Sequence, residues 1–190
     1  MKKSRMEAFS DGVLAIIITI MVLELKVPHG TDLNSLAPMI PVFLSYILSF
    51  VFLAIYWNNH HHLCQAIEKV NGSILWANIH LLFWLSLTPF VTAWMGENNF
   101  ASLPVALYGI ILLFDALAYF ILTITLKTHH DKDSKLVKAL GSDFKGKISI
   151  VIYVTAVLLA FVNSIIACSL YVLVALIWLI PDKRFERIIS

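Results

Sequence analysis

Apolar residues fill long uninterrupted stretches of this chain, and polar residues gather in the short segments between them. A helix that crosses the hydrocarbon core of a bilayer needs about 20 mostly apolar residues, whereas membrane β-strands show alternating segments of about ten. Four stretches have the length of one crossing helix, and a fifth is longer. They are residues 9–27, 36–57, 73–95, 103–126 and 148–181. The pattern predicts an all-α integral membrane protein.

Polar interruptions distinguish these stretches from one another. The first is the least apolar, because Asp11 lies near its start and both Glu24 and Lys26 lie near its end. The third contains Pro89, which removes a backbone donor and predicts a kink. The fourth carries Asp115 at its middle, where a carboxylate must face protein or water.

The fifth stretch is too long for one crossing. As a single helix its 34 residues would extend about 51 Å, which exceeds the thickness of an ordinary bilayer. Two short helices that turn near Asn163 and Ser164 would each rise about 25 Å, which is short but sufficient inside a bundle. The hairpin would consist of helices 148–162 and 165–180.

The basic residues support this hairpin and set the orientation. Lysine and arginine concentrate in cytoplasmic loops. Thirteen of the 14 basic residues fall at positions 2–5, 69, 127–147 and 183–187, and Lys26 is the exception. If these segments are all inside, an even number of crossings must follow the 127–147 loop. We therefore expect residues 1–190 to form one six-helix membrane domain with both termini cytoplasmic.

Composition argues against other classes of protein. Hydrophobic residues make up 59% of the chain and charged residues 14%, against about 45–50% and about 25% in soluble domains. The net charge of +2 is too small to suggest nucleic-acid binding. The longest segment outside the membrane has about 20 residues, too few for a soluble catalytic core. With no nucleophile–base pair and no metal-ligand spacing, we expect neither an enzyme nor a cofactor.

The first stretch is the best place to look for function, since it departs most from what lipid favours. At about 100° per residue, one helical face combines small, hydroxyl and branched apolar side chains. It consists of Gly12, Val13, Ile16, Thr19, Ile20, Leu23 and Val27. From the pattern alone this face is either an ordinary packing surface or a functional one.

The residues around this face resemble the transmembrane-protein-175 family. The matching segments are Arg5-x-x-x-Phe9-Ser10-Asp11 with a threonine eight positions after the aspartate, Trp57-Asn58-Asn59-His60-His61, and Thr88-Pro89-Phe90. The resemblance implies a potassium-permeable channel. Its single-repeat members in prokaryotes have six helices and assemble as homotetramers, and this length matches them. It therefore implies self-association in a bacterial plasma membrane.

The same resemblance implies a pore lined by the first helix of each subunit and narrowed by apolar side chains. Counting from the Phe-Ser-Asp motif places Ile16 at the tightest constriction, with Ile20 and Leu23 in the next layers and Thr19 beside them. The chain has no TVGYG carbonyl filter. We therefore expect a hydrophobic gate and only modest preference for potassium over sodium.

A second group of polar residues is expected at the cytoplasmic ends of the first two helices. Arg5, Ser10, Asp11, Trp57 and the neighbouring histidines should form a structural network there. The sequence also allows a gate that depends on histidine protonation. His60, His61 and the histidine after them do not suggest a metal site, since consecutive helical residues diverge by about 100°.

Asp115 leaves one alternative function open. His80 could lie at a comparable depth and pair with it. Such a pair would be either a buried polar clasp or the proton relay of a proton-coupled secondary transporter.

Overall fold

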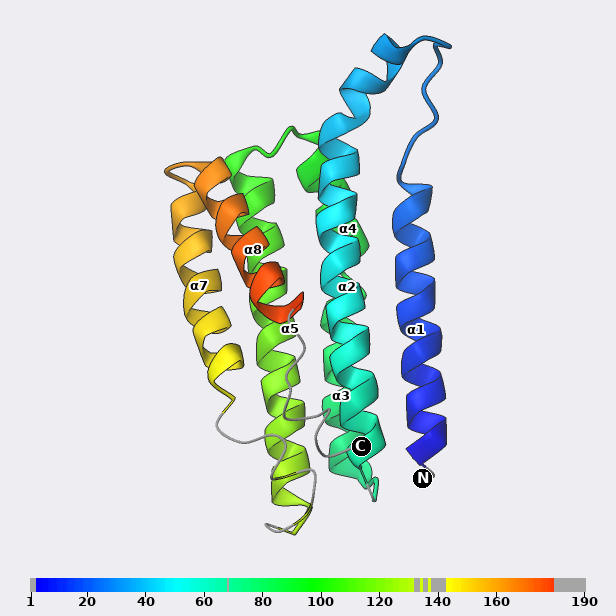
Figure 1. The fold of residues 1–190 in the computed structure, drawn as a ribbon, viewed down its shortest axis with the longest axis vertical. Helices are drawn as coiled ribbons and strands as arrows, with labels where there is room; N and C mark the ends of the chain where they lie inside the picture. Colours follow the sequence, from blue (N-terminus) through cyan, green and yellow to red (C-terminus); the bar gives the residue numbers. More distant parts are fainter. Residues whose placement is uncertain (1–2, 68, 132–133, 135–136, 138–142, 180–190) are drawn as a thin grey trace.

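The computed structural model describes residues 3–67, 69–131, 134, 137 and 143–179, and this part of the chain is helical without any strand. The helices are α1 (Lys3–Leu23), the 3-10 helix η1 (Leu33–Met39), α2 (Ile40–Ala66), α3 (Gly72–Leu85), α4 (Thr88–Glu97), α5 (Ser102–Thr128), α7 (Phe144–Ala160) and α8 (Ser164–Leu179). Figure 1 shows the long helices side by side, with the chain running on from η1 into α2 and from α3 into α4 and reversing direction at the other connections. Four segments are long and apolar enough to cross a membrane, namely 3–23, 33–65, 72–97 and 102–128. The chain is thus a multi-pass membrane protein.

The first two helices differ from the predicted apolar stretches at their ends. α1 begins at Lys3 rather than at residue 9 and ends at Leu23 rather than at 27. α2 continues to Ala66, nine residues beyond the predicted end at Trp57. Hydropathy marks the part of a helix that lipid can surround, whereas the backbone remains helical where polar side chains reach interfacial water. The histidine segment is therefore helical.

Pro89 divides the third predicted crossing into two helices. α3 ends at Leu85, and α4 begins at Thr88 with the proline in its first turn. Proline is tolerated there because the amides of a first turn lack intrahelical acceptors. The kink predicted from the sequence is therefore a short break inside one membrane-length segment.

The last two described helices form a hairpin. α7 ends at Ala160 and α8 begins at Ser164, so the turn lies where the sequence predicted it. The Asn163 side chain accepts hydrogen bonds from the Ile165 and Ile166 amides at 2.9 and 3.3 Å, which caps the start of α8. The basic residues 183–187 and nine of the 21 residues of the 127–147 loop lie outside the described residues.

Two apolar cores hold the bundle together. One joins α1 to α2, α3 and the final turns of α5, and the other joins α2, α4 and α5 to α7 and α8. Figure 1 shows α1 at one edge of the molecule and α7 at the opposite edge. Because of this position, the rest of the chain packs against only one side of α1.

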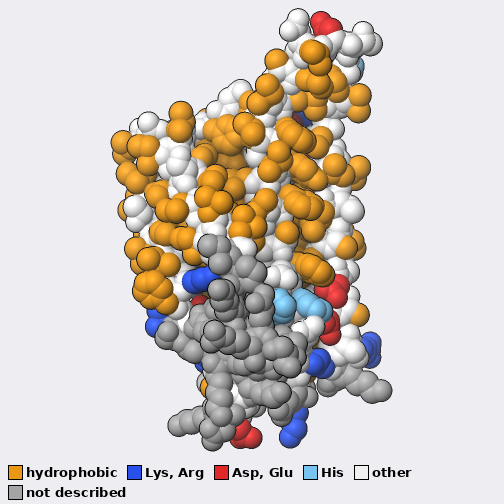
Figure 2. Space-filling view, in the orientation of Figure 1, with side chains coloured by type: hydrophobic (Ala, Val, Ile, Leu, Met, Phe, Trp, Pro, Cys, Tyr) orange, Lys and Arg blue, Asp and Glu red, His pale blue; other side chains and the backbone are white. Residues whose placement is uncertain are grey.

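Apolar side chains cover much of the face drawn in Figure 2, and histidine and charged side chains gather near the end that holds the N-terminus. Lys26, the exception to the predicted charge distribution, forms an ion pair with Glu97 at the opposite end. The Glu97 carboxylate raises the pKa of Lys26 by hydrogen bonding and charge. The ion pair neutralises the positive charge of Lys26, the one basic residue outside the predicted cytoplasmic segments.

Candidate pore-lining helix

The α1 helix has two contrasting faces. Its buried face packs into the subunit and consists of Met6, Ser10, Leu14, Ile17 and Met21. The opposite face contains the stripe singled out in the sequence. Exposed fractions there are 58% for Ile16, 42% for Ile20 and 78% for Leu23. Contacts within the chain therefore leave the predicted constriction residues uncovered.

The exposed stripe also carries its one hydroxyl and a glycine. Thr19 donates a hydrogen bond from its hydroxyl to the Ile16 carbonyl at 2.9 Å. The hydroxyl oxygen keeps lone pairs that can accept a further bond or approach a cation. Gly12 is exposed, and a Cβ added to it would meet no atom within 4 Å. Nothing in the subunit therefore requires glycine at this position.

An open groove of about 580 Å³ runs beside the stripe. Val13, Ile16 and Ile20 of α1 line one side, and Phe90 and Trp94 of α4 line the other. The two aromatic rings stack with their centroids 6.2 Å apart, and Phe90 is 62% exposed. The groove extends the uncovered apolar surface from α1 onto α4.

A buried hydrogen-bond chain anchors the first half of α1. The Ser10 hydroxyl accepts from the Asn78 side-chain amide at 3.0 Å, and His60 Nε2 donates to the Asn78 carbonyl oxygen at 2.7 Å. These side chains are between 0% and 2% exposed. They come from three helices, α1, α2 and α3. The sequence did not single out Asn78, although an asparagine in an otherwise apolar stretch is a signal for such a role.

A second set of contacts joins the same end of α1 to α2 nearer the surface. The Trp57 indole donates to the Asp11 carboxylate at 3.1 Å, and His61 Nδ1 lies 3.4 Å from the Glu7 carboxylate. The rings of Trp57 and His61 stack with their centroids 5.9 Å apart. Ser10 and Asp11 thus bind different partners, although they are adjacent in sequence.

The predicted network residue Arg5 and the motif residue Phe9 lie apart from both sets of contacts. Arg5 is exposed and makes no hydrogen bond or ion pair within the described part of the chain. Phe9 is 56% exposed on the outer side of α1. Both occupy the uncovered side of the helix because they follow its 3.6-residue period away from Met6 and Ser10. In residues 3–67, 69–131 and 143–179, no three histidine, cysteine or acidic side chains converge as metal ligands.

The predicted pairing of Asp115 with His80 is wrong. His80 is exposed on α3 and accepts a hydrogen bond from the Trp84 indole at 3.0 Å. Asp115 is 1% exposed within the bundle, and neither of its oxygens has a partner among the described residues. The two side chains diverge because one faces outward from α3 while the other points into the core.

These features define a multi-pass helical membrane protein. They are the apolar exterior, the antiparallel helices and the uncovered α1 stripe that contains Thr19. The profile of the family described as the endosomal/lysosomal potassium channel TMEM175 matches residues 5–89, which include α1 and its anchor. A potassium channel from Chryseobacterium sp. (strain P1-3) is 59% identical over 187 residues, which is 98% of this chain and 97% of the relative. The chain belongs to the TMEM175 family, as the sequence motif implied.

A solved structure shares the fold over nearly the whole chain. It is the crystal structure of a lysosomal potassium-selective channel TMEM175 homologue from Chamaesiphon minutus, with 27% identity and a TM-score of 0.81 over 95% of this chain and 97% of that one. The endosomal/lysosomal proton channel TMEM175 of Gallus gallus is 32% identical over 114 residues, 54% of this chain but 22% of that protein. Family and relatives are ion channels, so the protein is not an enzyme.

Proposed function

We propose that four copies of this chain form a potassium-permeable channel whose central pore is lined by the exposed stripe of α1. The name of the Chryseobacterium relative and the description of the Chamaesiphon structure both support potassium as the permeant ion. Their coverage of this chain, 98% and 95%, means that the similarity includes every described helix.

The observation that carries the proposal is the uncovered stripe itself. Ile16, Ile20 and Leu23 succeed one another along α1 at intervals of about one turn, or about 5 Å. Four stripes around one axis would place these side chains in three successive apolar rings. A ring of branched apolar side chains gates by excluding water until it is wide enough to hold it. In such a pore, the exposed Thr19 hydroxyl between the rings can contact ions or water. Against lipid it would find no such partner.

Selectivity in this pore would rest on weak preferences. No carbonyl filter is available to replace the hydration shell of an ion, so the larger and more easily dehydrated potassium ion would have a modest advantage. Hydroxyls of Thr19 from four subunits would add oxygen contacts where the ion loses water. The protein should therefore prefer potassium over sodium without excluding sodium.

The proposal includes the orientation of the subunit in the membrane. We place both termini in the cytoplasm, with six crossings that include the short helices α7 and α8, in a bacterial plasma membrane. The alternating helix directions in Figure 1 and the paired charge of Lys26 support this topology. The Ser10–Asn78–His60 chain and the Trp57–Asp11 bond would then anchor the pore helix at its cytoplasmic end.

Flux through purified protein in liposomes tests the proposal. Under a potassium gradient the wild type should give a flux that saturates poorly with concentration, as expected for a pore. Ile16→Ala should widen the constriction and raise the flux several-fold, whereas Val22→Ala, an exposed residue 46% open on another side of α1, should leave it unchanged. Equal flux in both variants would exclude Ile16 from the pore.

Proton permeation through the same pore is the second candidate. The reason is the name of the Gallus gallus relative, a proton channel, over the segment that it shares with this chain. A pH-sensitive dye inside the same liposomes would report proton entry. If both ions use the α1 pore, Ile16→Ala should change the two fluxes together. The proton-coupled transporter predicted as the alternative would instead require potassium flux to depend on a proton gradient, and the relay that motivated it is absent.

A further inference from the structure

Asp115 is the buried polar group that neither the pore nor its anchor uses. It lies in the middle of α5, is 1% exposed, and has no hydrogen-bond partner for either oxygen among the described residues. An isolated carboxylate in such surroundings is costly by many kcal/mol, and buried acids commonly avoid this cost by holding a proton. The neutral acid needs no counter-ion, only room for its hydrogen.

The charged and titratable groups around Asp115 offer it no positive partner. Three phenols, of Tyr56 on α2, Tyr108 on α5 and Tyr153 on α7, lie close enough to interact with it electrostatically. On the other neighbouring helices the titratable groups are the following. They are His80 of α3, which bonds to Trp84, Glu97 of α4, which pairs with Lys26, and Cys168 and Tyr171 of α8. The start of α7 also carries Asp143, Lys145 and Lys147, and Lys145 donates to the Ile177 carbonyl at 3.3 Å. No basic side chain among the described residues forms a hydrogen bond with Asp115. Burial without a cationic or hydrogen-bonding partner among the described residues therefore favours a protonated acid over a carboxylate.

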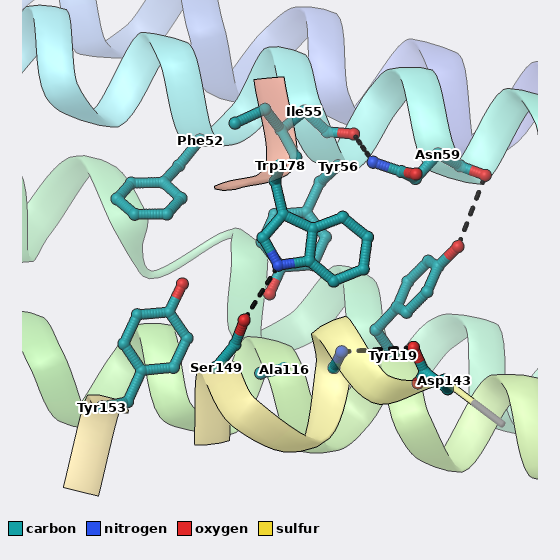
Figure 3. A pocket seen from close by; sticks show the side chains of 11 residues that line it. Phe52, Ile55, Tyr56, Asn59, Ala116, Tyr119, Asp143, Ser149, Tyr153 and Trp178 are labelled. Atoms are coloured by element: carbon teal, nitrogen blue, oxygen red, sulfur yellow. Dashed lines mark hydrogen bonds between the residues drawn. The ribbon is translucent and has the colours of Figure 1, made fainter. Parts of the chain in front are cut away.

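A small cavity lies beside the shell of these three phenols. Its volume of about 30 Å³ is enough for one or two water molecules. Ala116, the residue after Asp115, lines the cavity together with Tyr56 and Tyr153. Figure 3 shows that α2, α5, α7 and α8 all contribute side chains to it.

The cavity is polar enough to hold water and leads toward one end of the bundle. The Trp178 indole donates to the Ser149 hydroxyl at 2.9 Å within it, and Tyr119 donates to the Asn59 carbonyl at 3.4 Å (Figure 3). Asp143 lines the same cavity at the residue where α7 begins. Water in this cavity therefore has several hydrogen-bonding partners between the phenol shell and the start of α7.

We propose that Asp115 is a proton-binding site within each subunit, separate from the α1 stripe, and that its proton reaches water in this cavity when the packing of the phenol shell opens, because Asp115 itself does not line the cavity. Loss of the proton leaves a carboxylate on α5 and transfers one proton to that water. The proton is thus the ligand, and the site adds to the proposed channel function without depending on it.

Occupancy of this site should control how firmly α2, α5 and α7 pack together. The folded subunit holds a proton that the unfolded chain releases at neutral pH, so the free energy of unfolding falls as the pH rises. At alkaline pH the uncompensated charge would separate the phenols of α2 and α7 from α5. Asp115→Asn keeps the shape of a protonated acid and should remove this dependence.

Infrared spectroscopy of the protein in liposomes tests the site directly. At neutral pH the wild type should show the carbonyl stretch of a protonated carboxylic acid, and Asp115→Asn should lack it. Asp131→Asn, an exposed acid at the end of α5, should keep the band. In D₂O the wild-type band should shift within minutes if the cavity admits water. Absence of the band, its persistence in Asp115→Asn, or a band that does not shift in D₂O would overturn the proposal.

Thermal unfolding gives a second measurement. Between neutral and alkaline pH the midpoint for the wild type should fall, and the midpoint for Asp115→Asn should stay constant relative to Asp131→Asn. Parallel curves for all three proteins would contradict the proposal. If Asp115→Asn does not fold, Asp115→Glu replaces it, and the infrared band should move in frequency because the acid lies in a changed environment.

Discussion

Polar residues on α1 form hydrogen bonds with different partners, even where they are adjacent in sequence. Ser10 is buried and accepts from Asn78, Asp11 accepts from Trp57 at the surface, and Thr19 bonds to the backbone of its own helix. Because these partners differ, substitutions at the three positions should affect different properties of the protein.

Ser10→Ala should lower stability by about 1–3 kcal/mol. The substitution leaves the Asn78 amide buried without its acceptor, and an unsatisfied buried donor costs about that much. Thermal unfolding in detergent would measure the loss. Ser4→Ala, which changes an exposed serine of the same helix, is the control and should leave the midpoint unchanged. Equal midpoints for the two variants would show that the buried chain contributes no stability.

Thr19→Val should reduce the preference for potassium over sodium, since it removes the only hydroxyl of the proposed pore stripe while keeping the size of the side chain. Reversal potentials under mixed-ion conditions measure the permeability ratio. Thr155→Val on α7 is the matched control, because that hydroxyl also donates to a backbone carbonyl, at 2.9 Å. If Thr19→Val leaves the permeability ratio unchanged, the Thr19 hydroxyl does not contribute to selectivity.

Two glycines lie where neighbouring helices approach each other closely. A Cβ added to Gly96 of α4 would lie 2.7 Å from the Val42 Cα of α2, and one added to Gly109 of α5 would lie 2.0 Å from the Tyr171 hydroxyl of α8. These contacts connect α2 with α4 and α5 with α8. Pairs of helices in membranes rely on such small residues, since lipid provides no hydrophobic drive between them.

Gly109→Ala should therefore destabilise the α5–α8 contact by about 1–3 kcal/mol, the usual cost of overpacking. Tyr171→Phe should recover part of this loss in the double variant by removing the clashing hydroxyl, although it also removes the bond to the Val105 carbonyl at 3.1 Å. A double-mutant cycle of unfolding midpoints isolates the coupling. Gly72→Ala, where an added Cβ meets nothing within 4 Å, is the control. If the effects of Gly109→Ala and Tyr171→Phe simply add, the Tyr171 hydroxyl does not cause the clash, and other atoms move to make room for the added methyl group.

At the scale of the whole molecule, the position of α1 at one edge connects fold and function. The helix is fixed to α2 and α3 near its start, while its outer face remains uncovered, as the proposed tetramer requires. Stability of the subunit and assembly of the channel should therefore both depend on the anchored end. Conduction should depend on the stripe.

Asp11→Ala should weaken assembly rather than change ion preference. It removes the bond from the Trp57 indole that helps to hold the start of α1 against α2. Size-exclusion chromatography should show a smaller tetramer fraction, and the remaining tetramers should keep the wild-type reversal potential. Trp57→Phe removes the same hydrogen bond but retains an aromatic ring, so it should reproduce the effect in weaker form. A changed reversal potential with normal assembly would instead place Asp11 in the ion path.

The sequence by itself determined the features that depend on local composition. Long apolar stretches predicted helices, Pro89 predicted the break between α3 and α4, and Asn163 marked the turn of the hairpin. The arginine-to-aspartate motif identified the family, and the similarity to known channels confirmed it. Each of these signals resides in neighbouring residues, because helix formation and membrane insertion respond to the local sequence.

Tertiary structure decided which side of each helix meets which neighbour. In lipid both the buried and the exposed sides of a helix are apolar, so hydropathy could not show that Ile16 and Leu23 are uncovered while Leu14 is buried. Partners such as Asn78 for Ser10, and the isolation of Asp115 from His80, depend on contacts between helices far apart in sequence. The period of a helix fixes which residues share a face, but only packing against other helices determines where that face points.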